Sequence, residues 1–513
     1  MVRVPARWRR QSDCSSTRSI ETPRWAKPKR LYRLLQPRED WPVKRLSGWD
    51  AFLLYTEAPN VHMHTLKIAV IDLHGLGDRT FGIEEFRNVL HGRLHNLDPF
   101  RYQLVDIPFK FHHPMWRENC DVDLEYHIRP WRVAAPGGRR ELDEAVGEIA
   151  GTPLDRSRPL WEMYLVEGLA DDKIAVVGKI HHALADGVAS ANLLARGMDL
   201  QDGPQRDRDS YATDPAPSRP ELVRTAFWDH LRQIGRVPGL MKYTADGMGR
   251  VRRSTRKFGP ELTRPFTPPP SFMNHVLTPE RRFATASLAL ADVKTTGKQL
   301  GATINDMVLA MSSGALRKLQ LQYEGTADHP LLASVPMSFD FSPDRISGNR
   351  FTGVLMALPV DVDDPLERVK RASAAASLAK ESNQLIGPEL VARWASYIPP
   401  AAVEALFRRL SDKDGQNKVL NLNISNVPGP REQGRVGGAT VTEIYSVGPL
   451  TAASGLNITV WSYVDQLNIS VLSDTHTVED PHEVTDAMVS ELCEIRRAAG
   501  ISEDLTVLET ARA

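Results

Sequence analysis

The sequence has little of what would cross-link a fold or carry it through a membrane. Its 513 residues include three cysteines, Cys14, Cys120 and Cys493, which are far apart and odd in number. They suit neither a disulfide framework nor a Cys-x-x-Cys zinc site, and they favour a reducing cytosol. No apolar run reaches the ~18 residues that a membrane-spanning helix needs, so we expect any membrane contact to be peripheral.

Net charge is absent too. The 64 Lys and Arg residues balance 64 Asp and Glu residues, so no overall field favours a nucleic-acid partner. With 42% hydrophobic and 25% charged residues the chain is typical of globular proteins, and its length suggests two domains. A Gly-x-Ser-x-Gly nucleophile elbow is also missing, which leaves no such serine to form an acyl-enzyme.

One short stretch brings chemically useful side chains together. Residues 179–187 read Lys-Ile-His-His-Ala-Leu-Ala-Asp-Gly, which places His181, His182, Asp186 and Gly187 within one short segment. The β-branched segment 173–178 before it predicts a buried strand, paired as a hairpin with a second strand at 160–169, and the segment after it predicts a helix. Histidines at the end of a strand are held rigidly and stay reachable, which favours a functional site.

Three interpretations compete for this stretch. Buried structural histidines are the ordinary outcome for a single His, but here two imidazoles, a carboxylate and a glycine converge. A helical metal site would need a ligand at position 185, which is Ala185, and no Cys-x-x-Cys pair accompanies it. A general base fits best, because an imidazole with a pKa near ~6.5 accepts a hydroxyl proton at neutral pH. We therefore expect a histidine base and no metal.

The motif and its surroundings resemble a known family. His181-His182-x-x-x-Asp186-Gly187 resembles the HHxxxDG signature of the CoA-dependent acyltransferase superfamily. Further blocks in matching order make the chain similar to the bacterial wax ester synthase/diacylglycerol acyltransferase family; they lie at 46–53, 159–161, 301–306, 335–338 with 348–349, and 423–430. The sequence departs from that pattern at Gly48-Trp49, where a Pro-Leu pair is usual, and at residues 338–340, where a basic residue often follows.

The resemblance implies a fold and a set of roles. The implied fold is α/β (α+β), with two chloramphenicol-acetyltransferase-like domains and a tunnel between them. His182 is the implied base, His181 orients it or shapes the pocket, Asp186 anchors the loop through an arginine, and Gly187 permits the turn. Substrate-binding or supporting candidates are Asn305, Asp306, Pro159, Leu160, Trp161, Ser425 and Asn426. The simpler explanations are helix capping for Asn305 and Asp306, core packing for Trp161, and turn formation for Ser425 and Asn426.

Composition divides the chain into four segments. Residues 1–45 are a basic extension without the apolar core of a secretory signal; disorder is its ordinary explanation and contact with anionic headgroups its functional one. Residues 46–200 form the expected N-terminal acyltransferase domain with the HHxxxDG motif. Residues 201–270 form a proline-rich connection with a helix at 221–239 and a basic run at 250–257, which we interpret as a solvated face. Residues 271–513 form the expected second acyltransferase-like domain.

The implied reaction is acyl transfer from acyl-CoA, a co-substrate, with no cofactor bound to the protein. Diacylglycerol is the implied acceptor, giving triacylglycerol, and a long-chain fatty alcohol, giving wax ester, is the alternative. The chain would work in the cytoplasm at a peripheral membrane or lipid-droplet surface. Two alternatives remain open: a catalytically idle lipid-binding protein, which would not need an intact HHxxxDG motif, and a condensation-like enzyme acting on carrier-protein thioesters, for which the sequence offers no neighbouring carrier domain.

Overall fold

The computed structural model describes residues 43–77, 79–198, 213–258, 267–412, 419–502 and 504–509. These residues belong to one compact unit that begins at Pro42. The basic extension predicted at 1–45 lies outside the described residues apart from its last three. The domain boundaries predicted above stay a prediction.

The first large sheet carries the HHxxxDG motif at the end of a central strand. Among the described residues it has six strands in the order β12-β13-β2-β7-β6-β5. Their bounds are β2 (His64–Asp72), β5 (Ile128–Arg132), β6 (Trp161–Glu167), β7 (Lys173–His181), β12 (Arg435–Val436) and β13 (Ala439–Val447). The hairpin expected at 160–180 is confirmed, since β6 and β7 pair antiparallel.

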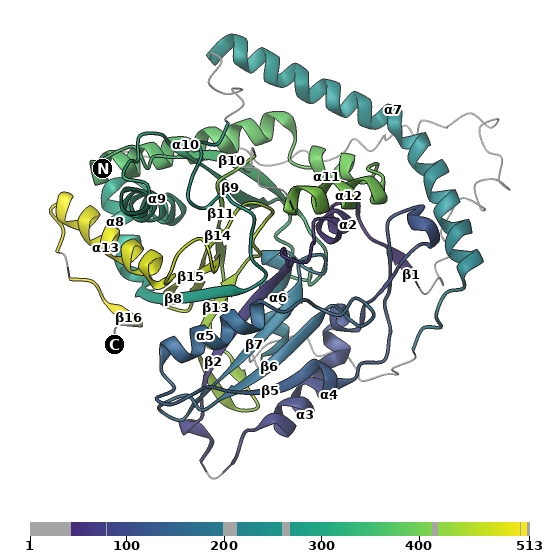
Figure 1. Cartoon of the computed structure of the whole chain (residues 1–513), viewed down its shortest axis with the longest axis horizontal. Coiled ribbons are helices and arrows are strands. Elements are labelled where there is room, and N and C mark those ends of the chain that lie inside the picture. The colour runs from purple at the N-terminus through teal and green to yellow at the C-terminus, as the bar shows by residue number, and fades with distance from the viewer. Residues whose placement is uncertain are drawn as a thin grey trace, which may run out of the picture. The chain divides into compact units, whose positions relative to one another are not determined.

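The second large sheet lies in the C-terminal half of the chain (Figure 1). Within the described residues its order is β10-β9-β11-β14-β15-β8-β16. The strands are β8 (Arg281–Ala289), β9 (Leu331–Ser338), β10 (Phe351–Leu358), β11 (Leu422–Pro428), β14 (Leu456–Tyr463), β15 (Gln466–Asp474) and β16 (Val507–Glu509). A small sheet joins β1 (Val43–Arg45), β4 (Met115–Arg117) and β3 (Gln103–Val105).

Helices cover both sheets. The α-helices are α2 (Gly48–Tyr55), α3 (Ile83–Arg93), α4 (Leu124–His127), α5 (Arg139–Ala150), α6 (Gly187–Gly197), α7 (Arg219–Phe258), α8 (Leu290–Leu300), α9 (Ile304–Tyr323), α10 (Pro365–Ile386), α11 (Leu390–Ala395), α12 (Pro400–Ser411) and α13 (His482–Ala498). Short 3-10 turns are η1 (His74–Leu76), η2 (Leu94–Asn96), η3 (Asp98–Arg101) and η4 (Pro108–Lys110). None of the helices in the described ranges is both long and apolar enough to span a bilayer.

Two hydrophobic cores form, one mainly on each large sheet. Leu66, Ile68 and Val177 belong to the first core, and Leu309, Leu331 and Ile469 to the second. One C-terminal strand crosses between them, because β13 pairs antiparallel with β2 and so completes the first sheet. This pairing ties the two halves of the chain together at β2, the strand next to β7.

Helix α7 differs from the expectation of a helix ending at 239. It runs from Arg219 to Phe258 as a single helix with Pro238 inside it, and it includes the start of the basic run. Local sequence predicts a break at Pro238 and Gly239. The helix continues because one face packs on α10 and α11, burying Leu240 and bringing Gly247 against the backbone of Ile386.

Candidate active site

The two motif histidines sit where β7 ends and a loop leads to α6. The neighbouring strands hold the loop backbone, since His181 N–H donates to the Leu160 carbonyl at 2.9 Å and His182 N–H donates to the Met63 carbonyl at 2.8 Å. Leu160 belongs to the Pro-Leu-Trp block, so that block supports the loop through its backbone. Backbone hydrogen bonds alone therefore fix the positions of both histidines, without any side-chain contact.

The ring of His182 is oriented by Asn349. His182 Nδ1 lies 3.0 Å from Asn349 Oδ1. The Asn349 amide has only one orientation, because its Nδ2 donates both to Asp50 Oδ1 and to the His182 carbonyl, each at 2.8 Å. An acceptor at Oδ1 requires a proton on His182 Nδ1. Neutral His182 therefore carries its basic lone pair on Nε2, which makes no hydrogen bond to the described part of the chain.

Asp50 holds Asn349 in place from α2. Its Oδ1 also accepts the Asn349 backbone N–H at 2.9 Å, and its Oδ2 accepts the Ser47 hydroxyl at 2.6 Å. Ser47 in turn caps α2 by accepting the Asp50 N–H at 3.0 Å. Burial raises the pKa of Asp50 from its ordinary value, and the hydrogen bonds from Ser47 and Asn349 oppose that shift. A buried carboxylate thus reaches the His182 imidazole through an amide.

The surroundings keep His182 neutral. Its side chain is half-buried beside the ring of Phe351, and burial lowers its pKa from the ordinary 6.5. The charge of Lys67 also lowers this pKa, and Asp186 opposes it. Lys67 is itself buried, with its Nζ donating to Ser446 and lying 4.9 Å from the Trp461 ring centroid, and burial lowers its pKa to about 7. A low pKa leaves Nε2 free to accept a proton at neutral pH.

His181 points the other way. It is fully buried, and its Nδ1 accepts the Ala183 N–H at 3.0 Å. Its proton is therefore on Nε2, which faces Glu57 Oε1 at 3.8 Å. Burial lowers the pKa of His181 to about 4 even though Glu57 acts to raise it. His181 is thus neutral and enclosed, whereas His182 is half-buried.

Asp186 is clamped by the segment 345–350. Arg345 donates to both carboxylate oxygens at 3.0 Å, and the Arg350 N–H donates to Oδ2 at 2.8 Å. Asp186 also caps α6 by accepting the Ala189 N–H at 2.9 Å. None of these bonds goes to an imidazole. The arginine that the resemblance implied for Asp186 has its counterpart in Arg345, and the pair fixes the loop rather than the base.

Gly187 serves a different purpose from the one expected. It is the first residue of α6 and is not among the glycines with positive φ. A Cβ at this position would lie 3.1 Å from Cγ2 of Val427. The requirement is close packing against β11, not the freedom of a left-handed turn. The positive φ in this region belongs to Gly348, at +75°.

The other residues proposed from the sequence as substrate-binding or supporting occupy different parts of the fold. Trp161 is fully buried, stacks on Phe100 and His127, and donates to the Phe100 carbonyl at 2.8 Å, so it is a core residue. Ser425 and Asn426 are half-buried on β11, next to the Val427 that packs on Gly187. Pro159 accepts the Trp161 N–H in the turn before β6.

Asn305 and Asp306 open α9 in the second half of the chain. Asp306 and Thr303 form a reciprocal capping box, in which Thr303 N–H donates to Asp306 Oδ2 at 2.9 Å and Asp306 N–H donates to Thr303 Oγ1 at 3.2 Å. Ser373 on α10 adds a hydrogen bond of 3.2 Å to the same carboxylate. Capping therefore accounts for the position of Asp306, and Asn305 beside it is half-buried.

Aromatic side chains stand beside the base at the point where the sequence departs from the family pattern. Trp49 stacks on Phe52 with centroids 5.3 Å apart and meets Phe351 edge-on at 5.8 Å, and Phe351 lies 5.5 Å from the His182 ring. Gly48 is required by packing, since a Cβ there would lie 2.1 Å from the Ser396 nitrogen. The departure thus gives a bulkier apolar wall next to His182.

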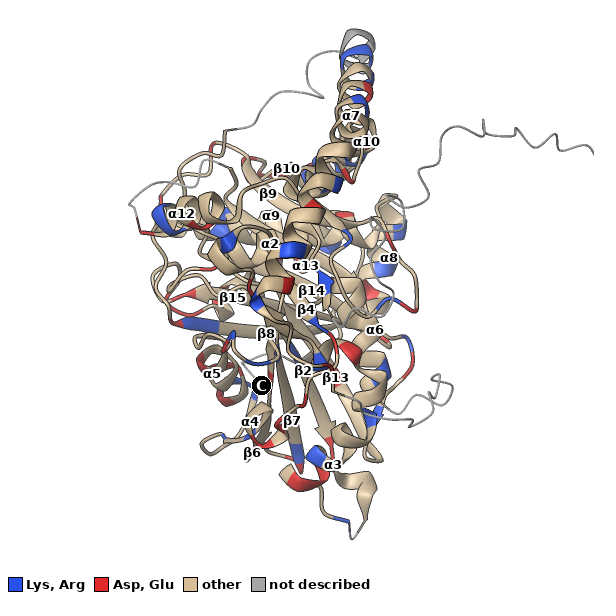
Figure 2. Cartoon of the chain, turned by 90° about the vertical axis from the view of Figure 1, so that its right-hand side faces the viewer, with Lys and Arg blue, Asp and Glu red and all other residues tan. Residues whose placement is uncertain are grey.

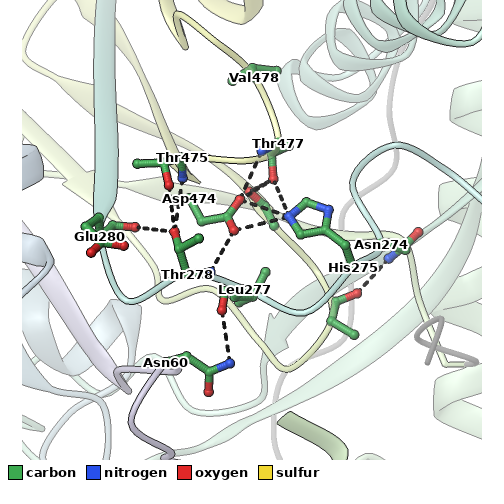
Figure 3. A network of polar contacts seen from close by, with 12 residues as sticks. Asn60, Asn274, His275, Leu277, Thr278, Glu280, Asp474, Thr475, Thr477 and Val478 are labelled. Carbon is green, nitrogen blue, oxygen red and sulfur yellow. Dashed lines mark hydrogen bonds and ion pairs between the residues drawn. The ribbon is translucent and has the colours of Figure 1, made fainter. Parts of the chain in front are cut away.

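A second network contains the residue types of a hydrolytic triad (Figure 3). His275 Nε2 lies 3.1 Å from Asp474 Oδ2, and Thr477 Oγ1 donates to Asp474 Oδ1 at 2.5 Å. However, His275 Nδ1 faces the Phe272 carbonyl at 3.1 Å. Both ring nitrogens point at acceptors, which favours the doubly protonated ring and leaves neither nitrogen directed at open space. The hydrogen bond to Asp474 raises the pKa of His275 accordingly.

A cavity of about 550 Å³ lies away from the histidine loop. Its lining comes from α4, β5, α5 and β6, and includes Tyr126, Trp131, Glu162 and Tyr164 but neither motif histidine. The half-buried ring of His182, which Asn349 orients and whose pKa is lowered, therefore lies outside this cavity. Across the described ranges no group of three or more His, Cys, Asp or Glu side chains is arranged to hold a metal ion.

Sequence reasoning missed the residues that orient the base. Ser47 and Asp50 lie in the block at 46–53, and Asn349 lies in the block at 348–349. Both blocks carried the resemblance, but their polar residues were given no role. The signal was the presence of Asp and Asn among apolar neighbours, where a buried polar side chain needs a partner. Arg345 had no sequence signal at all.

Comparisons with known proteins agree with this geometry. Residues 46–308 match the family described as wax ester synthase/diacylglycerol acyltransferase catalytic domain, and residues 347–496 match the WS/DGAT C-terminal domain. A protein of Mycobacterium tuberculosis strain H37Rv is 71% identical over 472 residues, which cover 92% of this chain and 100% of the relative. The name of that relative provisionally assigns it diacylglycerol O-acyltransferase activity.

Solved structures support the fold. The wax ester synthase/diacylglycerol acyltransferase from Marinobacter aquaeolei VT8 has a TM-score of 0.64 and 26% identity, covering 89% of this chain and 100% of that chain. The first condensation domain of the calcium-dependent antibiotic synthetase has a TM-score of 0.55 and 14% identity, covering 91% and 99%. The second likeness concerns the fold alone. Together they confirm the expected two-domain chloramphenicol-acetyltransferase-like architecture.

Proposed function

Because this chain belongs to the wax ester synthase/diacylglycerol acyltransferase family, we propose that it makes triacylglycerol by transferring a long-chain acyl group from acyl-CoA to diacylglycerol. The observation that carries the proposal is the orientation of His182 by Asn349, which leaves Nε2 unprotonated. A catalytically idle lipid-binding protein has no use for such a fixed tautomer. Acyl-CoA is a co-substrate here, and the reaction calls for no resident cofactor.

In the proposed reaction the acyl group passes directly between substrates. His182 Nε2 takes the proton of the acceptor hydroxyl as its oxygen attacks the thioester carbonyl. The tetrahedral oxyanion then collapses and expels the CoA thiolate. A thiol of this kind has a pKa near ~8.5, so the imidazolium at His182 returns the proton to sulfur. Both substrates would meet at His182 in a tunnel between the two domains.

The roles of the other site residues follow from their contacts. Asn349 keeps the His182 proton on Nδ1, and Asp50 keeps Asn349 in place. Asp186 and Arg345 hold the loop that carries the base, and His181 fills the space beneath it. Removing the base should stop the reaction, whereas removing His181 should slow it through a less rigid loop.

The acceptor alcohol determines whether the product is triacylglycerol or wax ester. Both acceptors in the family name, diacylglycerol and a long-chain alcohol, offer a primary or secondary hydroxyl on an apolar chain, and His182 would serve either. The Trp49 and Phe351 wall beside the base suits an apolar acceptor of either kind. These acceptors dissolve in lipid, so we also place the protein at the cytoplasmic surface of a membrane or lipid droplet.

The test offers both acceptors to the same preparation. Purified protein with labelled palmitoyl-CoA is incubated with dioleoylglycerol or hexadecanol, and His182→Ala and His181→Ala are assayed beside it. We expect triacylglycerol as the main product, a loss of about 10³-fold in His182→Ala, and a smaller loss in His181→Ala. If wax ester dominates, the alternative acceptor is correct. If folded protein binds acyl-CoA but forms neither ester, the acyl transfer proposed here is wrong.

A further inference from the structure

Helix α7 carries a stripe of exposed apolar side chains along one side. Phe227, Ile234, Met241 and Met248 are exposed and recur at seven-residue intervals, and Leu231 lies four residues after Phe227. Seven residues are nearly two helical turns, so these side chains stay on the same side of the helix over its length. Ile234 and Met248 are 66% and 67% exposed. So much apolar surface on one helix marks an interaction site.

The stripe is separate from the face that holds α7 on the protein. Leu222, Ala226 and Leu240 are buried. Contacts to α11 and the residue after it come from this inward side, where Thr244 accepts from Trp394 Nε1 at 3.0 Å and Gln233 Nε2 donates to the Ser396 carbonyl at 3.0 Å. The inward face therefore explains why the helix is attached, and the stripe is left for another partner.

Cations surround the stripe. Val223, 38% exposed and four residues before Phe227, extends the stripe toward the start of α7. Arg219 lies four residues before Val223 and Arg252 four residues after Met248, so both continue the same side of the helix. Arg224 and Lys242 follow Val223 and Met241 by one residue. The acidic residues Glu221, Asp229 and Asp246 each lie two residues from a stripe position, which is roughly 200° round the helix. Lys and Arg are visible along α7 in Figure 2. The formal net charge of the whole chain is zero, so the gathering of Lys and Arg around the stripe is a local feature of α7.

A neighbouring turn adds an aromatic residue. Phe109 in η4 is 97% exposed. It adopts φ +60° and Lys110 adopts φ +51°, a left-handed conformation that non-glycine residues seldom take. η4 is joined to α7 beside the stripe, because His230, between Phe227 and Ile234, bonds the Phe111 carbonyl at 2.7 Å and its ring lies 4.9 Å from the Phe111 ring. The backbone is thus held in a costly conformation that presents Phe109 to the exterior.

We propose that this surface, made of the α7 stripe, its rim of cations and Phe109, docks the protein on a bilayer that bears anionic phospholipid headgroups. An apolar side flanked by Arg and Lys is the composition of a helix that lies in the membrane interface. Long cationic side chains reach the headgroups while the apolar side chains enter the acyl region. The inference deepens the proposed function, on which it rests, because acyl acceptors of the kind named there reside in such a bilayer.

The test compares two triple variants of the full-length protein. Phe227→Ser/Ile234→Ser/Met241→Ser removes the stripe, and Leu321→Ser/Val507→Ser/Leu508→Ser removes three similarly exposed apolar side chains of α9 and β16. Binding is measured by co-sedimentation with phosphatidylcholine vesicles with and without phosphatidylglycerol. We expect the unaltered protein to bind the anionic vesicles, the stripe variant to lose about tenfold or more in bound fraction, and the control to bind normally.

Two further measurements test the contribution of the cations and the alternative that the stripe joins two copies of the chain. The triple variant Arg224→Gln/Lys242→Gln/Arg252→Gln should lose the preference for anionic vesicles. Added salt should likewise weaken the binding of the unaltered protein to anionic vesicles. Equal binding by the stripe variant and the unaltered protein would overturn the proposal. So would a dimer in light scattering that the stripe variant converts to a monomer, since the stripe would then join two copies of this chain.

Activity on a water-dispersed short-chain alcohol separates this inference from the proposed function. The stripe variant should retain that activity, because α7 contributes no residue to the His182 network. Loss of vesicle binding with this activity intact supports the docking surface. An unaltered protein that binds anionic vesicles through the stripe but transfers no acyl group would sustain the docking surface and refute the proposed acyl transfer.

Discussion

Two polar networks in this molecule each combine an imidazole with a buried carboxylate, and they arrange them differently. In the first, Asp50 touches His182 only through the amide of Asn349. In the second, Asp474 contacts the ring of His275 directly (Figure 3). The pKa of His182 is lowered, while that of His275 is raised. The pattern of residue types is similar, but only the first arrangement leaves a base.

The difference follows from what each partner does to the charged ring. A carboxylate beside an imidazole favours the imidazolium and so raises its pKa. An amide oxygen fixes the Nδ1 proton without supplying a full negative charge. The contact with Asn349 orients His182 while burial favours its neutral ring, whereas the contact with Asp474 favours the protonated ring of His275. The comparison teaches that a base in a buried site benefits from an uncharged intermediary.

The largest effect should come from removing that intermediary. In Asn349→Ala, His182 Nδ1 loses its acceptor, so the ring can turn and place its proton on Nε2. We expect kcat for acyl transfer to fall about 10³-fold, within the range that general bases contribute. Single-turnover assays with saturating palmitoyl-CoA measure the change. Asp474→Asn is the matched control from the other network and should keep kcat; an Asn349→Ala protein with normal kcat would refute the orientation argument.

The next effect concerns the clamp under the loop. Asp186 is buried, and the side chain of Arg345 is 10% exposed. Asp186→Asn removes the nearer of the two carboxylates beside the guanidinium, since Asp340 lies 3.6 Å from Arg345 Nε. Breaking a buried pair on one side costs about 3 kcal/mol. We expect urea unfolding to show a loss of that size, along with weaker activity because the loop is less ordered. A variant with unchanged stability and structure that has lost all activity would instead assign Asp186 to the chemistry.

A smaller effect, and one restricted to stability, should come from the His275 network. Asp474→Asn removes a buried hydrogen-bonded charge, which we expect to lower the free energy of unfolding by about 2 kcal/mol. His275 has a raised pKa, so its contribution is present below its ordinary 6.5 and is lost as the pH rises through the folded-state value. Hydrogen bonds from His275 and Thr477 hold the pKa of Asp474 below 3.8 against the effect of burial, so its contribution is lost as the pH falls.

The pH dependence therefore has a defined window. The difference in stability between the unaltered protein and Asp474→Asn should be largest near about pH 5–6 and should shrink toward higher pH. Denaturant titrations at several pH values measure it, with kcat as the parallel readout. A stability difference that stays constant from acid to alkaline pH would contradict the ion pair. A lower kcat in Asp474→Asn under conditions where the variant is fully folded would give His275 a part in catalysis.

The sequence carried the family and much of the local structure. The pattern at 160–180 predicted the β6–β7 hairpin, and helix capping was the simpler explanation for Asn305 and Asp306, which open α9. The HHxxxDG match predicted the family, which is confirmed. These features are local in the chain, so short-range propensity and spacing reveal them. The antiparallel pair of β14 and β15, joined by a short turn, is local in the same sense.

Contacts between distant segments were the part that the sequence did not reveal. Asn349 lies 167 residues from His182, and Asp50 lies 299 residues from Asn349. No periodicity or motif connects them. In the fold, the segment 345–350 packs on the motif loop through backbone bonds of Gly348 to Leu184 and Asp186. For the same reason the helix predicted to end at Gly239 continues to Phe258, because α10 and α11 support it from outside the local sequence.

The smallest effect is the most direct test of the comparison, because it converts one network into the other. The double variant Asp50→Asn/Asn349→Asp exchanges the carboxylate and the amide, so a carboxylate now accepts the His182 Nδ1 proton as Asp474 does for His275. A carboxylate in this position raises the pKa of an imidazole. We expect the acid limb of the kcat/KM profile to move up by about one pH unit, with activity largely retained at pH 8 because the tautomer is preserved. The single variant Asp50→Asn, which adds no charge beside the ring, is the control and should leave the limb where it was. An unchanged limb in the double variant would mean that the amide orients His182 without keeping its pKa low.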